Sequence, residues 1–149
     1  MRVTNTSRNT TFDLEVVYSA VCATLKAHDA EPCEVSVLLT DDIDMRQLNR
    51  DYRDIDAPTD VLAFSMREGE EGDLNPGLLG DLVVSLETAA RQASTREGLG
   101  GVCGDLETEV ALLTVHGMLH LLGYDHQTQE EAKVMFEKQR SIFRLLQEL

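Results

Sequence analysis

The chain has 149 residues, 42% hydrophobic and 27% charged, which predicts one compact domain over residues 1–149 with a single hydrophobic core. Multidomain, collagen-like and wholly disordered architectures are excluded by the same figures. The 13 basic and 27 acidic residues give a formal net charge of −14, which disfavours nucleic-acid binding unless basic residues gather in one cleft.

The N-terminal third of the chain predicts a strand, a helix and a second strand. Arg2 to Asn5 can form a short edge strand. Apolar residues then recur at helical spacing and predict a helix over Phe12 to Ala27. Residues Glu34 to Leu39 alternate between apolar and more polar side chains, which predicts a half-buried strand.

The middle of the chain predicts a second helix and two further strands. Thr40 or Asp41 can cap the helix, which is expected to reach Tyr52. The runs Val61 to Phe64 and Leu79 to Ser85 are β-rich, and the second has little polar interruption, so we expect it at the centre of the sheet. The acidic, glycine-containing loop between these runs is too short for a well-formed crossover helix and therefore predicts antiparallel pairing.

The C-terminal half of the chain predicts three helices. Ser85 begins a helix that runs through Ala93, and Asp105 follows a glycine-rich loop as the N-cap of a helix that carries histidines. Thr128 to Glu131 form a capping box for the last helix. The expected buried face of this last helix consists of Ala132, Met135, Phe136, Ile142, Phe143 and Leu146.

About four strands interleaved with five helices define the expected fold class, an α/β (α+β) domain. Its sheet is expected to be small and mixed.

The sequence predicts neither a membrane segment nor an export signal. The N-terminal residues MRVTNTSRNT are polar, and the most apolar stretch, Val110 to Leu122, falls short of the ~20 residues of a spanning helix. Cys22, Cys33 and Cys103 are odd in number and lack C-x-x-C spacing, which favours a reducing compartment. We therefore expect a cytoplasmic protein whose three thiols lie in the core.

Three of the four histidines lie within the eleven residues HGMLHLLGYDH. His116 and His120 are four residues apart, which on a helix places their rings on one face roughly 6 Å apart. Gly123 follows where a helix C-terminus favours a left-handed residue, and it can turn the chain so that His126 meets the other two. Three neutral imidazoles suit one Zn²⁺ ion and leave a fourth position open, as in catalytic zinc sites.

Other interpretations of the histidines remain open. Two helical histidines can be core or surface residues with an accidental third, or the three can hold a structural zinc ion, although such sites usually have four protein ligands. Asp125 could complete such a site, accept an N–H from a ligand imidazole, or be a simple turn residue. The spacing matches H-E-x-x-H-x-x-G-x-x-H, but Gly117 replaces the general-base glutamate, which disfavours peptide hydrolysis.

The segment HGMLHLLGYDH resembles the signature H-G-x-L-H-L-x-G-Y-D-H of the bacterial YbeY family. Residues Leu48 to Ser65, LNRDYRDIDAPTDVLAFS, are similar to the family's N-x-x-Y-R and PTDVLSF segments, with Ala63 in place of the usual serine. Residues Leu78 to Ser85, LLGDLVVS, are similar to its G-D-I-x-I-S strand. The resemblance implies a zinc-dependent, single-strand-specific endoribonuclease involved in 16S rRNA 3′-end maturation and ribosome quality control.

The same resemblance implies a sheet surrounded by helices, with the histidine-bearing helix leading to a metal cleft. It also implies partners and site residues. The partners are single-stranded RNA of the small ribosomal subunit, the ribosome, an assembly GTPase and a small-subunit ribosomal protein, with no membrane. His116, His120 and His126 become the zinc ligands, and Arg53 becomes the residue that handles the phosphate. Arg46, Arg50 and Arg53 also follow one stripe of the predicted second helix and could form a local positive cleft. Alternatively the stripe is a solvated face whose arginines pair with Asp42, Asp44, Asp51 and Asp54.

The chemistry is a hypothesis at this point. Zinc lowers the pKa of a bound water toward ~7 or polarises a phosphoryl oxygen, while Arg53 offsets charge in the transition state. The general base remains open between Asp125, hydroxide on the zinc ion and a 2′-hydroxyl of the RNA. Thr59, Asp60 and Ser65 are further candidates to line the cleft. Two other functions remain open: a metal-containing ribosome-assembly binding module with weak or no nuclease activity, and a metallohydrolase of another substrate class.

Overall fold

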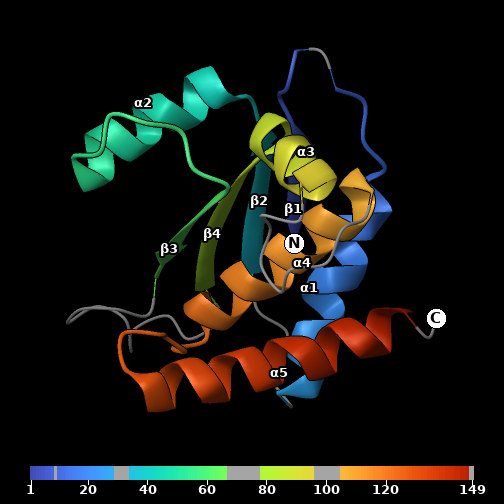
Figure 1. The fold of residues 1–149 in the computed structure, drawn as a ribbon. Coiled ribbons are helices and arrows are strands. Elements are labelled where there is room, and N and C mark those ends of the chain that lie inside the picture. The colour runs from blue at the N-terminus through green and yellow to red at the C-terminus, as the bar shows by residue number, and fades with distance from the viewer. Residues whose placement is uncertain (9, 29–33, 67–77, 96–104, 148–149) are drawn as a thin grey trace.

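The computed structural model describes residues 1–8, 10–28, 34–66, 78–95 and 105–147 (Figure 1). Within these residues the elements follow in the order β1 (Arg2–Asn5), α1 (Leu14–Ala27), β2 (Glu34–Thr40), α2 (Asp42–Arg53), β3 (Val61–Ser65), β4 (Leu78–Ser85), α3 (Leu86–Thr95), α4 (Leu106–Leu121) and α5 (Gln129–Gln147). The predicted α+β class is therefore confirmed. The predicted loops over 67–77 and 98–104, together with Cys33 and Cys103, lie outside the described residues.

The four described strands form one mixed sheet in the order β1-β2-β4-β3. Strand β1 pairs with β2 in parallel, and β2 pairs with β4 in parallel, whereas β3 pairs with β4 antiparallel. The predicted edge position of β1, the central position of β4 and the antiparallel β3–β4 pair are all confirmed. Because β4 has a neighbour on each side and helices above and below, Leu82, Val83 and Val84 are all buried, whereas Asp81 is exposed.

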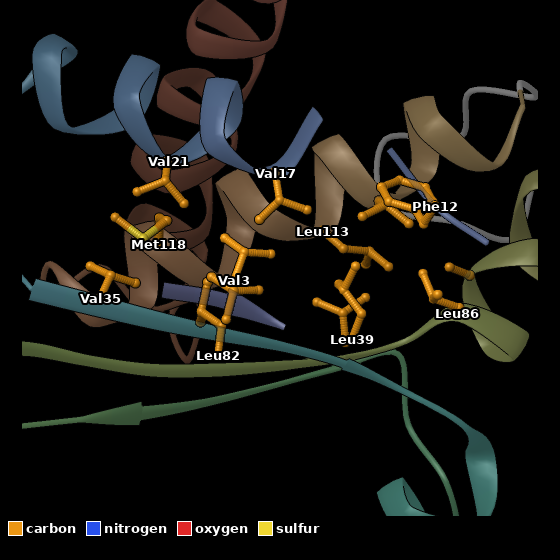
Figure 2. Close-up of a cluster of buried hydrophobic side chains, with 14 of the residues drawn as sticks. Val3, Phe12, Val17, Val21, Val35, Leu39, Leu82, Leu86, Leu113 and Met118 are labelled. Carbon is orange, nitrogen blue, oxygen red and sulfur yellow. The ribbon is translucent and has the colours of Figure 1, made fainter. Parts of the chain in front are cut away.

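The sheet separates two apolar layers. Helices α1 and α4 pack on one face, where Figure 2 shows Val21 and Met118 pointing toward Leu82 and the other side chains of the strands. On the opposite face, Met45 of α2 packs against Val83 of β4. Consecutive residues of β4 thus contact different layers, as the two-residue period of a strand requires. Helix α2 is held on the far side of the sheet from α4, as Figure 1 also shows.

Two predictions for α1 were wrong in detail. The helix begins at Leu14, two residues later than predicted, because Asp13 is its N-cap and accepts a hydrogen bond from a backbone N–H of the first turn. Cys22 is exposed rather than in the core. It lies outside the buried stripe of α1 to which Val17 and Val21 belong. The prediction was wrong because it relied on the apolar character of cysteine and not on its position on the helix.

Asp42 joins the first turn of α2 to the start of α3. Its Oδ1 accepts hydrogen bonds from the Ser85 and Thr88 hydroxyls, each at 2.6 Å, and its Oδ2 lies 2.8 Å from a guanidinium nitrogen of Arg91. Burial raises the pKa of the Asp42 carboxyl, but these three donors outweigh burial and lower the pKa below its usual value. The network fixes the start of the helix that ends in Arg53.

Replacing Asp42 with alanine is expected to lower the free energy of unfolding at pH 7 by about 1–3 kcal/mol, because three donors lose their acceptor. The pKa of Asp42 is lower in the folded protein than in the unfolded chain, where it is near 3.9. The stabilisation is therefore fully present above about pH 3.9 and is lost as the pH falls through the pKa of the folded protein. Urea titrations of both proteins at pH 7 and in acid measure it.

The exposed Asp51 on the same helix, whose ion pair with Arg50 spans 3.7 Å, supplies the control. Its alanine variant should change stability by less than about 0.5 kcal/mol. A difference between the wild type and Asp42→Ala that stays constant down to acid pH would contradict the assignment.

Candidate metal centre

The three histidines of the motif converge at the C-terminal end of α4. Asp105 caps this helix as predicted, accepting a hydrogen bond from the backbone N–H of Thr108 at 2.8 Å. His116 and His120 lie on one face, and Gly123, with φ of 104°, turns the chain so that His126 meets them. One ligand atom from each histidine lies within 4.8 Å of the others. Within the described residues, this group could hold a metal ion.

The ring nitrogens of the two helical histidines are fixed by acceptors. His116 Nδ1 lies 2.7 Å from Oε1 of Gln139, and His120 Nδ1 lies 3.0 Å from the backbone oxygen of Tyr124. Because both partners are acceptors, each neutral ring carries its proton on Nδ1 and a lone pair on Nε2. The two Nε2 atoms are 3.2 Å apart. Two lone pairs at that distance repel each other unless a cation lies between them, so the donor set fits a metal ion.

The electrostatic surroundings keep these rings neutral. Burial lowers the pKa of His116, and the neighbouring His120 and His126 lower it further against the opposing effect of Gln139. Burial also lowers the pKa of His120, followed by the charge that His126 can carry. Neutral imidazole is the form that binds a metal ion, so the site does not have to release protons from these two rings near pH 7.

Helix α5 forms a wall of the site. The Phe136 ring lies 6.1 Å from that of His116 and 6.2 Å from that of His126, measured between centroids. Gln139, on the same helix, is buried and holds His116. Phe136 was predicted on the buried face of this helix, but Gln139 was missed. The sequence signal for it is a polar residue in the apolar stripe that contains Met135 and Ile142.

An open cleft of about 640 Å³ leads to the histidines. Arg53 lines it from the end of α2, so the structure brings together all four residues predicted for the site. Of the three further candidates, Asp60 and Ser65 line the cleft and Thr59 does not. The histidines differ in exposure: His116 is buried, His120 is half-buried and His126 is exposed.

The arginine stripe of α2 does not enter the cleft as a unit. Arg46 forms a two-pronged interaction with Asp56, at 2.7 and 3.0 Å, and Arg50 lies 3.7 Å from Asp51. Both arginines are exposed and lie outside the cleft lining. The solvated-face alternative therefore holds for these two arginines, with Asp51 as one of the predicted partners and Asp56 as an unpredicted one. Of the stripe, Arg53 alone lines the cleft.

Asp125 has a backbone role in this structure. It lines the cleft, and its carboxylate accepts a hydrogen bond from the N–H of His126 at 2.7 Å. The acceptors that orient His116 and His120 are Gln139 and the Tyr124 carbonyl, so the alternative in which Asp125 accepts an imidazole N–H does not hold for these two rings.

Gly117 explains why the position after the first histidine carries no glutamate. A Cβ atom there would lie 2.7 Å from Cδ2 of Leu82 and 3.3 Å from Cγ2 of Val61. Helix α4 therefore packs directly on the sheet at this glycine. A glutamate side chain has no space there, which agrees with the absence of the peptidase general base.

Glu109 is a buried carboxyl two turns before His116 on α4. The residue is 2% exposed, and its Oε1 has no hydrogen-bond partner in the described structure. Burial, followed by the charge of Asp60, raises the pKa of Glu109 to about 7. The side chain is thus protonated over much of the pH range in which an exposed glutamate is charged.

Replacing Glu109 with glutamine is expected to stabilise the protein at pH 8 by roughly 1–2 kcal/mol, after allowance for solvent screening. Between the unfolded pKa near 4.3 and the native value, the native state holds more protons, so wild-type stability falls as pH rises through this window. Glutamine does not titrate, so the variant does not lose stability as the pH rises through this window. Urea titrations at pH 4 and pH 8 test this, with exposed Glu107→Gln as the control, and an equal gain at both pH values would contradict it.

No helix in the described ranges is long and apolar enough to cross a membrane.

Known proteins resemble the chain over three quarters or more of its length. A family model described as "Endoribonuclease YbeY" matches residues 2–147. A protein of that name from Syntrophotalea carbinolica is 40% identical over 152 residues, covering 99% of this chain and 96% of its own. Another from Pelotomaculum thermopropionicum is 49% identical over 114 residues, covering 75% and 71%. The solution structure of a Thermotoga maritima protein matches with a TM-score of 0.64 and 26% identity, covering 96% of this chain and 87% of that one.

Proposed function

Because the chain belongs to the YbeY family of endoribonucleases and is thus a hydrolase acting on RNA, we propose that it is a zinc-dependent, single-strand-specific enzyme. Its role is in 16S rRNA 3′-end maturation and ribosome quality control in the cytoplasm. Residues 1–149 form one hydrolase domain. The partners are the small-subunit rRNA and the ribosome, with an assembly GTPase and a small-subunit ribosomal protein.

The observation that carries the metal dependence is the convergence of His116 and His120 through Nε2 atoms 3.2 Å apart, with both Nδ1 atoms engaged by acceptors. His126 completes a set of three imidazoles. Imidazole suits Zn²⁺, and three protein ligands leave one position open, which is typical of catalytic rather than structural zinc. One zinc ion held by His116, His120 and His126 is therefore the proposed cofactor.

The chain's own residues prepare the phosphate for cleavage. A bound zinc ion supplies Lewis acidity toward a phosphoryl oxygen. Arg53 presents a guanidinium to the same cleft, where it binds the phosphate and offsets the charge that develops in the transition state. The net charge of −14 repels RNA from most of the protein. A positive charge in the cleft attracts the phosphate group there.

The ends of the RNA products distinguish the candidate attacking groups. A 2′,3′-cyclic phosphate identifies the RNA's own 2′-hydroxyl as the nucleophile. A 5′-phosphate with a 3′-hydroxyl identifies water, for which Asp125 at the cleft is the candidate base.

The test uses labelled single-stranded RNA and a duplex of the same sequence, with zinc-loaded protein, chelator-treated protein and two arginine variants. We expect the loaded wild type to cut the single strand and spare the duplex, and the chelated protein to be inactive. Arg53→Ala should lose about 10²–10³-fold in rate, in line with the loss of an electrostatic contact to the transition state.

Arg46→Ala is the matched control, because Arg46 belongs to the same helix and the same stripe but pairs with Asp56 outside the cleft. It should retain wild-type cleavage. A chelator-treated protein that cuts as fast as the zinc-loaded protein would reject the zinc dependence, and equal cleavage of the duplex would reject the single-strand specificity.

A further inference from the structure

We propose that His28 is a positioning residue of the metal centre: its hydrogen bond to Tyr124 anchors the turn that orients His120 and carries His126. This inference rests on the proposed metal site. His28 is the fourth histidine of the chain and stands at the C-cap of α1, outside the HGMLHLLGYDH segment.

The contact between His28 and Tyr124 is close and specific. His28 Nε2 lies 2.8 Å from the Tyr124 hydroxyl oxygen. The two rings meet edge to face, with centroids 5.2 Å apart and planes at 82°. Tyr124 also packs against an apolar cluster in which Ala20 of α1 and Leu119 of α4 take part. The end of α1 and the turn after α4 are therefore joined by a hydrogen bond as well as by packing.

Tyr124 connects this contact to two of the histidines. Its backbone oxygen accepts the Nδ1 proton of His120, which directs Nε2 of that ring toward the metal position. His126 follows two residues later in the same turn. Gly123, just before Tyr124, makes the turn with a positive φ, and a Cβ there would meet nothing within 4 Å. The glycine itself therefore adds little packing, and the Tyr124 side chain is what ties the turn to α1.

The arrangement parallels the support of His116. Gln139 of α5 bonds His116 directly, whereas His28 acts on His120 through Tyr124. Burial, and then the charge of Lys138 on α5, lower the pKa of His28. The ring is thus neutral at pH 7 and contributes a hydrogen bond rather than a charge.

The test measures the dissociation constant of zinc by competition with a chromophoric chelator, in the full-length protein. His28→Phe keeps an aromatic ring and removes the hydrogen bond, and Tyr124→Phe removes the hydroxyl from the other side. Each is expected to weaken zinc binding by about 3–10-fold, at or below the usual range for changes outside the ligand shell. The double variant should bind zinc no more weakly than either single variant.

Two further variants separate positioning from general loss of stability. His28→Gln retains a hydrogen-bonding group and should recover most of the affinity. Leu25→Ala, in the same last turn of α1, removes a side chain packed on the core and should lower the melting temperature while leaving zinc affinity within twofold.

The outcomes are distinct. A wild type that binds no zinc refutes the metal site itself. A wild type that binds zinc with a His28→Phe variant of equal affinity overturns the positioning role, as does an additive double variant. The visible spectrum of the cobalt-substituted proteins gives a second readout, since a displaced His120 ring changes the ligand geometry and hence the absorption bands.

Discussion

Replacing His120 with alanine is expected to weaken zinc binding by more than about 100-fold and to abolish RNA cleavage, while the protein stays folded. Changes outside the ligand shell already weaken metal binding by about 10–100-fold, and His120 supplies a ligand atom itself. The fold should survive because His120 is half-buried at the end of α4, beside an open cleft, and its loss leaves the core clusters intact. Mass spectrometry of metal content, beside circular dichroism, measures both properties.

Gln127→Ala is the control for this variant. Gln127 lines the same cleft one residue after His126 but does not belong to the histidine group. It should keep one zinc ion per chain. A folded His120→Ala protein that retains stoichiometric zinc would show that the metal is held elsewhere.

Replacing Gly80 with alanine is expected to lower the free energy of unfolding by about 3–5 kcal/mol, a large part of the stability of a typical domain. Gly80 of β4 has φ of 150°, and a Cβ there would lie 2.3 Å from the backbone oxygen of Phe64 and 2.9 Å from Cδ2 of Leu121. Its strand partner, Ser65 of β3, keeps the two backbones at this separation. The methyl group of alanine at position 80 therefore causes backbone strain as well as overpacking.

Gly123→Ala is the matched comparison, because Gly123 also has positive φ but a Cβ added there would meet no atom within 4 Å. Its alanine variant should lose only the conformational cost of about 1–2 kcal/mol. Urea titration of the two variants gives the difference directly. Equal losses of stability would show that the backbone conformation, and not the contact with Phe64, is what makes alanine unfavourable at position 80.

Local patterns predicted most of the fold. The alternation in β2, the mostly apolar run of β4 and the caps at Asp105 and Thr128 each depend on neighbours in the chain, and each is confirmed. The convergence of the three histidines was predictable for the same reason, since helical spacing and one glycine determine it.

The contacts that were missed join residues far apart in sequence. Gln139 reaches His116 from another helix, and His28 reaches Tyr124 across 96 positions. No periodicity relates such pairs, because their meeting depends on how the helices pack on one another. The pairing of Arg46 with Asp56 was missed for a related reason, since the chain turns back after α2 before Asp56 comes within reach.

Helix α4 is buried around nearly its whole circumference, with Leu113 and Met118 in the core and His116 at the metal position. A substitution at one of the buried positions of this helix therefore alters the packing of the core as well as the surroundings of the histidines. Substrate preference has more freedom to change in strand β3, from which Ala63 and Ser65 border the cleft, than at Arg53 or the histidines. The architecture therefore places two of the three histidines on a helix that the core constrains on nearly every side, and other cleft residues on a strand that it constrains less.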